Sequence, residues 1–543
     1  MPGILSHNGL LGGRISGSAL QTGVCITAAS GFLLFGYDQG IMSGIITEPM
    51  FLEQFPQMDP DNKSGAIQAL VVAIYEVGCL MGSFLIVFIG DKLGRRRSVL
   101  IGTLIMLIGT ALQSTAFTLG HMIVGRIVTG FGNGMNTSSI PVWQSEMAPP
   151  KIRGFLVLFE GALITGGIML SYWVNYGFWF VTQYDSFQWR FPIALQAVFG
   201  IGLIIGVLLY PESPRWLIKS GHADEAREIM AVLENKTPED PTLIADIEEM
   251  QRVNAITQST KLTTKELLSN GKEMNLWRLS VACLSQAFQQ LGGLNLVTYY
   301  ATTVFESSLG FGPELSRLMT GCLGTEFFLA ALVALVVVDR LGRRRLMLWG
   351  AVGMGTSLLI IGACLSKATD TYKAPAYAAT VFIFVYNTCF AIGWLGVTWL
   401  YPAEVTPIRI RAEANGFSTC SNWLINYGVV QLAPIMINKI SWQTYFVFMC
   451  FNYMHVPVVF WFFPETNGYK LETMDAIFEK AHAKGENPVW TERHVRKGKE
   501  GLDLEKHEHP GQAGEPEGAL RGAEEEKEEI SRDESDSRKP SDV

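Results

Sequence analysis

The chain has 543 residues, of which 48% are hydrophobic and only 17% carry a charge. The apolar residues stand in blocks of about 18 or more, the length of a helix that crosses a bilayer, which excludes an ordinary set of soluble domains. The formal net charge of −8 is concentrated at the C-terminus, where residues 500–543 hold 15 acidic and 6 basic residues. The rest of the chain is close to neutral, and we expect no nucleic-acid partner.

Twelve apolar blocks predict an all-α membrane protein with twelve transmembrane helices in two pseudo-symmetric six-helix bundles. The blocks span roughly 22–45, 66–89, 98–118, 122–143, 155–177, 191–210, 278–304, 317–338, 346–366, 376–400, 413–436 and 442–463. Three motif pairs recur at nearly one offset, which indicates a duplicated plan. They are GDKLGRRR (90–97) with DRLGRRR (339–345), SEMAPPKIRG (145–154) with AEVTPIRIRA (403–412), and PESPR (211–215) with PETNG (464–468).

The blocks divide the chain into five parts. We expect an N-terminal segment (1–21), a first bundle (22–210), a linker with short helices (211–277), a second bundle (278–463) and a tail (464–543) that is acidic and disordered from about 485. Lys and Arg gather in the motif loops, so the positive-inside rule predicts that both termini are cytosolic. All eight cysteines fall inside predicted spans, where Cys is a packing residue, and we expect no disulfide, metal site or cofactor.

Three charged residues inside the first half's spans, two acids and one base, are considered together. Asp38 lies in the first block, where an ionised carboxylate costs about 2.5–3.5 kcal/mol and marks a candidate functional site. Arg126, in the fourth block, is its natural partner. The pair either couples a proton to transport or only fixes helix packing. Glu76, in the second block, is a relay or a structural hydrogen-bonding group.

The repeated loops carry acids and bases at the ends of spans from both halves. We predict that they form a network that clamps the cytosolic side shut and dissolves when that side opens. Its expected members are Asp91, Arg95, Glu146, Arg153, Glu212, Arg215, Asp339, Arg343, Glu404 and Arg411. The alternative is that these charges only set the topology.

The seventh block carries a dense set of neutral polar side chains around Gly292 and Gly293, which can loosen the helix. Amides and phenols both donate and accept hydrogen bonds, as sugar hydroxyls do, so they suit a neutral polyhydroxylated ligand. The alternative is that they bond only other helices. The candidate binding residues of the seventh block are Gln289, Gln290, Asn295 and Tyr299. The tenth block adds Trp399, and the eleventh adds Asn422, Trp423 and Asn426.

These motifs together resemble the sugar porter family of the major facilitator superfamily, fungal members in particular. The resemblance covers about 20–480 and rests on FGYDQG, GDKLGRRR, SEMAPPKIRG, PESPRWL, QQLGGLN, DRLGRRR and PETNG. It implies two bundles that rock about a central sugar site lined by Gln289, Gln290, Asn295, Tyr299, Trp399 and Asn422. It also implies that Phe35 caps the site and that Asp38 and Arg126 are a proton-linked pair.

The chain departs from the family near the fifth block. Gly161 stands where many sugar porters have a Gln, and Glu160 is beside it, in a stretch, LFEGALITGG, similar to fungal glycerol–proton symporters. We therefore expect a plasma-membrane transporter for a monosaccharide, hexose or pentose, with proton symport. Glycerol or polyol symport, facilitative uniport and, more remotely, sugar sensing remain alternatives.

An enzyme and an ATP-driven pump are not expected, because no catalytic constellation and no GxxxxGK[ST] phosphate loop is present. The expected partners are a sugar or polyol, protons and the lipid bilayer.

Overall fold

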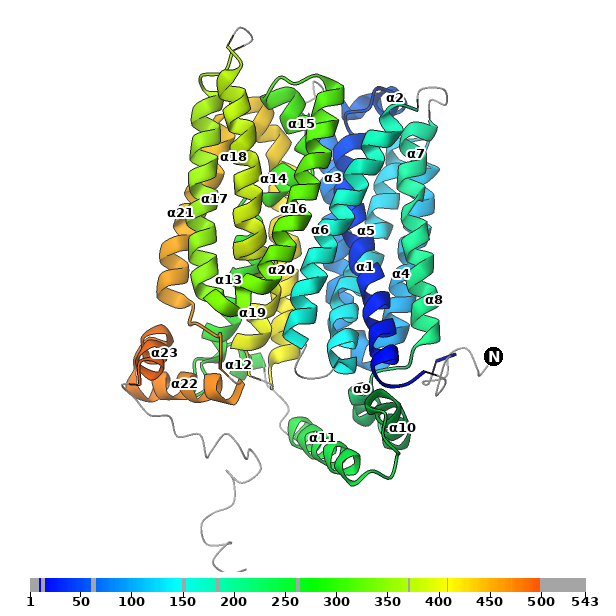
Figure 1. The fold of residues 1–543 in the computed structure, drawn as a ribbon, viewed down its shortest axis with the longest axis vertical. Coiled ribbons are helices and arrows are strands. Elements are labelled where there is room, and N and C mark those ends of the chain that lie inside the picture. The colour runs from blue at the N-terminus through cyan, green and yellow to red at the C-terminus, as the bar shows by residue number, and fades with distance from the viewer. Residues whose placement is uncertain are drawn as a thin grey trace, which may run out of the picture.

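The computed structural model describes residues 9–10, 15–59, 65–148, 153–181, 186–259, 264–369, 372–407, 409–469 and 471–498. Two groups of long helices stand side by side, one from each half of the chain, and short helices lie beyond one end (Figure 1). Helices α3 and α20, and helices α6 and α16, pack against each other across the boundary between the halves. The prediction of an all-α protein built from two bundles is confirmed.

The helices follow the apolar blocks in order. The first half contains α1 (Gly17–Ile45), the short α2 (Pro49–Gln54), α3 (Ala66–Leu93), α4 (Arg95–Ser114), α5 (Leu119–Met147), α6 (Arg153–Trp179), α7 (Phe187–Ala194) and α8 (Gln196–Leu209). The second half contains α13 (Asn275–Leu291), α14 (Leu294–Thr298), α15 (Ala301–Thr303), α16 (Pro313–Leu341), α17 (Arg343–Leu365), α18 (Ala374–Phe390), α19 (Val397–Val405), α20 (Arg411–Ile440) and α21 (Gln443–Phe462). Single π-helical turns follow α15 (Val304–Ser308) and α18 (Ala391–Leu395).

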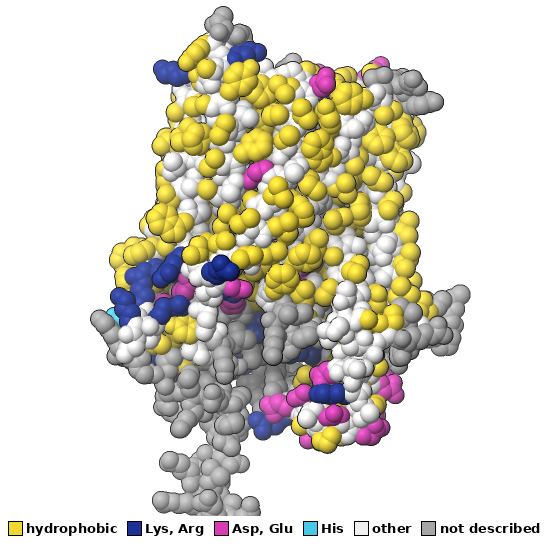
Figure 2. Space-filling model, viewed as in Figure 1, with side chains coloured by type: hydrophobic (Ala, Val, Ile, Leu, Met, Phe, Trp, Pro, Cys, Tyr) yellow, Lys and Arg dark blue, Asp and Glu magenta, His cyan; other side chains and the backbone are white. Residues whose placement is uncertain are grey.

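Nine helices within the described part of the chain are long and apolar enough to cross a membrane. The other three of the twelve expected spans are helical too, but α5 and α20 are more polar and the seventh span is broken into short pieces. Hydrophobic side chains cover the middle of the visible surface, while Lys, Arg, Asp and Glu gather near its ends (Figure 2). Large apolar side chains such as Trp349, which is 74% exposed, are expected on a lipid-facing surface.

The seventh span breaks at its two glycines. Helix α13 ends at Leu291, and α14 restarts after Gly293, whose φ of +94° favours glycine. A Cβ at Gly293 would also lie 2.9 Å from the Phe448 ring. Two further breaks were not predicted. The sixth span divides into α7 and α8 just after Pro192, and the tenth passes through a π-turn, where Gly393 approaches the backbone of Gly350.

Short helices lie beyond the end of the bundles that carries the repeated loops (Figure 1). The linker forms α9 (Pro214–Lys219), α10 (Ala223–Glu234), α11 (Pro241–Ser259) and α12 (Thr264–Leu267), and the tail forms α22 (Leu471–Lys484) and α23 (Pro488–Arg496). The expected start of disorder at about 485 is therefore too early. Asn487 caps α23, Val489 is buried, and Trp490 packs on Trp461, so apolar contacts continue to this point. The acidic segment after 498 lies outside the described residues.

Candidate functional site

A chain of side-chain amides joins α13, α14 and α20 at the centre of the second half. Asn422 donates to Gln286 (2.6 Å) and Gln289 (2.9 Å) and accepts from Gln290 (3.1 Å). Asn295 donates to Gln290 (2.6 Å) and to Asn426. All six amide side chains are buried, and of their polar atoms only Asn426 Nδ2 has no hydrogen-bond partner among the described residues. We call these six residues the amide cluster.

The amide cluster lies against the first half. Gln39 of α1 donates to Asn295 over 3.4 Å. The Phe35 ring packs edge-on against Trp423, with their centroids 5.7 Å apart, and the Trp423 indole donates to Ser83 of α3 (3.0 Å). Helices from both halves therefore enclose one polar centre, as an alternating-access site requires.

The structure separates the candidate binding residues into two groups. Gln289, Gln290, Asn295, Asn422 and Asn426 are in the amide cluster, while Phe35, Trp423 and Tyr299 border it. Trp399 is only half-buried on α19, and no hydrogen bond or ring contact with a described residue joins it to the cluster.

Sequence reasoning missed Gln286 and Gln39. Gln286 lies three and four residues before Gln289 and Gln290, so helical spacing could have found it. Gln39 directly follows Asp38, and only the tertiary fold brings it to Asn295.

The predicted charge pair lies inside the first half. Arg126 Nη1 of α5 is 3.6 Å from Asp38 Oδ1 of α1, and both side chains are fully buried. The guanidinium also donates to the Val72 carbonyl (3.1 Å) and lies over the Tyr75 ring at 4.5 Å. At 3.6 Å the pair is a loose ion contact rather than a hydrogen bond, so the charges can separate without breaking a tight bidentate bond.

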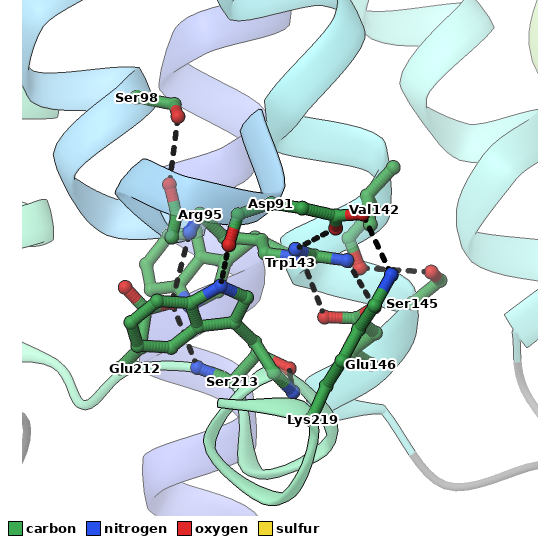
Figure 3. A network of polar contacts seen from close by, with 12 residues as sticks. Asp91, Arg95, Ser98, Val142, Trp143, Ser145, Glu146, Glu212, Ser213 and Lys219 are labelled. Atoms are coloured by element: carbon green, nitrogen blue, oxygen red, sulfur yellow. Dashed lines mark hydrogen bonds and ion pairs between the residues drawn. The ribbon is translucent and has the colours of Figure 1, made fainter. Parts of the chain in front are cut away.

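Figure 3 shows the charged network at the first repeated loop, where Arg95 lies between Asp91 and Glu146. Arg95 donates two hydrogen bonds to Glu146 (3.0 and 3.1 Å) and one to Asp91 (3.1 Å), and Lys219 of α9 pairs with Asp91 at 2.6 Å. Glu212 accepts from the backbone amides at the start of α4 and from that of Ser213. Burial raises the pKa of the Glu212 carboxyl, and these donors act against that rise.

The second half repeats the positions of the Arg, its two acids and the Glu at the start of the following helix. Arg343 donates two hydrogen bonds to Glu404 (3.2 and 3.0 Å) and pairs with Asp339 (3.0 Å). Glu465 occupies the place of Glu212 and accepts from the amides that begin α17. Sequence reasoning missed Glu465, although it is the Glu of PETNG that matches the Glu of PESPR.

The glycine of each LGRRR motif has a structural reason. Gly94 and Gly342 have φ of +86° and +91°. A Cβ there would lie 2.8 Å from a Glu212 oxygen and 2.6 Å from a Glu465 oxygen. Only glycine allows both the backbone conformation and the close carboxylate.

The clamp on the cytosolic side stays a prediction, and the structure shows where its expected members lie in one conformation. The ion pairs of the described residues fasten helix ends within each half, because each Arg and its acids belong to one bundle. Arg215 is exposed, and no described acid pairs with it. Arg411 donates to the Thr406 carbonyl (3.1 Å), and the side chain of Arg153 lies outside the described residues.

At the opposite end of the bundles, Arg317 of α16 connects the halves. It donates to Thr47 (2.8 Å) and pairs with Glu306 (2.8 Å) of its own half. Buried Glu48 faces it, and burial raises the pKa of Glu48 to about 8, although Arg317 acts to lower it. Glu48 therefore holds its proton at neutral pH in this conformation.

We expect Arg343→Ala to lower the thermal stability of the purified protein. It removes two hydrogen bonds to the Glu404 carboxylate, one to Asn467 and the pair with Asp339, and hydrogen bonds to charged groups contribute about 1.5–3 kcal/mol each. The matched control is Arg345→Ala, because Arg345 is exposed two residues away on the same helix. A thermal melt that shows equal losses for both variants would contradict the structural role of Arg343.

A family model described as sugar (and other) transporter matches residues 24–478. The sugar transporter STL1 of Saccharomyces cerevisiae is 38% identical over 91% of this chain and 86% of that protein. The major facilitator superfamily transporter mfsA of Aspergillus fumigatus is 37% identical over 87% of this chain and 89% of that protein. The proton:xylose symporter XylE, solved with bound 6-bromo-6-deoxy-D-glucose, has a TM-score of 0.71 and 26% identity, covering 85% of this chain and 99% of that one.

The chain therefore belongs to the sugar transporter family of the major facilitator superfamily, as its motifs predicted. It is a multi-pass membrane protein of a transporter family rather than of an enzyme family.

Proposed function

We propose that this protein carries a monosaccharide across the plasma membrane by alternating access, coupled to the inward movement of a proton. The amide cluster is the observation that carries the proposal. Its neutral side chains each donate and accept, and they can exchange their mutual hydrogen bonds for bonds to sugar hydroxyls. No chemical change in the substrate is involved, so the proposed role is not enzymatic.

The proton-binding role falls to Asp38, beside Arg126. A buried carboxylate beside a cation stays charged, and it takes up a proton when the cation moves away. The two residues contact each other loosely, on α1 and α5, next to the amide cluster. XylE, which shares the fold, is a proton:xylose symporter, and this supports the same coupling here.

Alternating access follows from the rigidity of each half. The paired Arg–Glu networks hold the helix ends of each bundle together, so each bundle can move as one body. The broken seventh helix lies where the bundles meet, and its glycines can absorb the change in backbone angles.

The orientation rests on charge. The N-terminal end of α1 and helices α22 and α23 lie at the same end as the LGRRR loops (Figure 1). By the positive-inside rule we place this end in the cytosol.

A polyol such as glycerol is the second candidate substrate. Many sugar porters have a Gln at the position of Gly161. A Cβ placed on Gly161 would lie 3.7 Å from the Cα of Gly396, which belongs to the other half. The site therefore offers one amide fewer to a hexose. Glu160 beside it is buried and adds an acid instead.

Purified protein in liposomes tests the proposal, with labelled glucose and labelled glycerol supplied side by side. We expect one label to accumulate above equilibrium only under an inward proton gradient. Gradient-independent equilibration would instead identify a facilitator, in which Asp38 and Arg126 are structural.

A further inference from the structure

Glu76 is a completely buried acid on α3 that reaches across the boundary between the halves. The Tyr299 hydroxyl donates a 2.5 Å hydrogen bond to its Oε1, and Tyr299 terminates α14 in the broken seventh helix. Asn426 of the amide cluster presents a neutral amide to the same carboxyl group. Glu76 therefore borders the proposed sugar site, and nothing in the proposed function yet uses it.

Two acids and one base meet at this point. Arg126 attracts both Glu76 and Asp38, whereas the two carboxyl groups repel each other when both are charged. The other titratable neighbours are two residues of α3, Tyr75 and Cys79, and two residues of the second half, Tyr299 and Tyr300; these side chains are neutral at ordinary pH. Within the described part of the chain, Arg126 is the only cation that the contacts place beside Glu76.

A single guanidinium balances a single carboxylate. If Glu76 and Asp38 were both ionised, a net negative charge would be enclosed in the membrane interior, where an unpaired charge is costly. Two carboxyl groups that compete for one cation instead hold one proton between them, and they titrate as a pair. The conformation seen here is therefore neutral when the pair carries one proton.

We propose that Glu76 is a second proton-binding residue of the transport cycle, which shares one transported proton with Asp38 beside Arg126. The inference rests on the proposed symport and deepens it. The proton adds to a carboxylate of the pair from one side of the membrane and forms a carboxylic acid. It leaves the pair toward the other side and restores the carboxylate, so only an O–H bond forms and breaks.

The hydrogen bond from Tyr299 connects this proton to the moving part of the site. A charged carboxylate accepts a hydrogen bond more strongly than a neutral acid does. Loss of the proton from Glu76 therefore changes the force on the broken helix, next to the amide cluster. In this way the proton state of the first half acts directly on the substrate-facing helix of the second half.

Glu76→Gln tests the inference, because the amide keeps an acceptor for Tyr299 and removes the acid. The variant retains one acid, Asp38, and one base, so neutrality no longer requires a proton. In liposomes with labelled glucose and labelled glycerol, we expect accumulation under a proton gradient to be lost. Exchange of labelled for unlabelled substrate should continue, and its dependence on pH should flatten.

Three further variants sharpen the test. Glu76→Asp keeps an acid and should accumulate substrate with a shifted pH profile. The combination of Glu76→Gln with Asp38→Asn leaves Arg126 without a counter-charge, so exchange should be lost although each single variant retains it. The matched control is Glu326→Gln on α16, because Glu326 bonds only to α18 of its own half in the described structure and should keep full accumulation.

The outcomes separate this inference from the proposed function. If the wild type accumulates neither label under a gradient, the symport itself fails, and the inference with it. If the wild type and Glu76→Gln accumulate substrate equally and with the same pH profile, only the role of Glu76 is overturned. Should the Gln variant not be recovered folded, Glu76→Asp decides, since an unshifted pH profile would overturn the inference and a shifted one supports it.

Discussion

Asp38→Asn is expected to abolish concentrative uptake while exchange across the membrane continues. The amide fills the same buried space beside Arg126 but cannot ionise or carry a proton. One acid, Glu76, and one base, Arg126, then remain, so neutrality no longer requires a proton, and substrate reaches at most the same concentration on both sides. Uptake of labelled substrate into liposomes, with and without an imposed gradient, measures the accumulation ratio directly.

The matched control for this variant is Asp246→Asn, because Asp246 is exposed on linker helix α11. It should accumulate substrate as the wild type does. If Asp38→Asn also concentrates substrate, the pair with Arg126 is structural, and the coupling group lies elsewhere.

Asn422→Ala is expected to raise the half-saturating substrate concentration by about 10- to 100-fold. Asn422 bonds three glutamines of α13 in the unliganded site; in the bound state it would bond a substrate hydroxyl instead, and a buried hydroxyl left without that partner costs about 1–3 kcal/mol. Each 1.4 kcal/mol corresponds to about a tenfold change in affinity. Initial rates of exchange at a series of substrate concentrations give this value.

Asn387→Ala on α18 controls for the loss of a buried amide in the same half. Asn387 is buried and donates to Glu326, away from the amide cluster, so its loss should leave the half-saturating concentration close to that of the wild type. Equal values for Asn422→Ala and the wild type would remove Asn422 from the binding site. The amide cluster would then serve helix packing alone.

The plan of two bundles could be predicted because the sequence shows both apolar blocks long enough to cross a bilayer and motifs that recur in the two halves. The length of an apolar block cannot locate a break such as that between α7 and α8, because the block has the same length and composition whether its helix is continuous or broken. Gly292 and Gly293 were the exception, since two adjacent glycines in an apolar block indicate a break. The start of disorder was predicted too early for a similar reason. The contact of Trp490 with Trp461 exists only in the folded chain, so the sequence around Trp490 does not reveal it.

Part of the candidate site could be predicted from the sequence for a related reason. A polar residue within an apolar block, such as Gln290 or Asn422, is conspicuous without any structure. Partnerships between blocks are not, so neither the contact of Gln39 with Asn295 nor that of Glu76 with Tyr299 could be read from spacing. The charges at the repeated loops were found, but sequence could not show that each Arg binds acids of its own bundle.

The contacts between the halves are nearly all uncharged. This determines how much free energy is needed to separate the two halves at either end. At the LGRRR end, no ion pair of the described residues joins the two bundles. At the other end, Arg317 keeps Glu306 as its partner within its own bundle and gives up the Thr47 hydroxyl, the face of the Trp179 ring and its place beside Glu48. Neither opening step therefore breaks an ion pair between the bundles among the described residues, and breaking such a pair in a medium of low dielectric constant would be expensive. The barrier between the two facing states is set by the exchange of neutral hydrogen bonds and ring contacts with water, and the turnover rate should be almost insensitive to ionic strength.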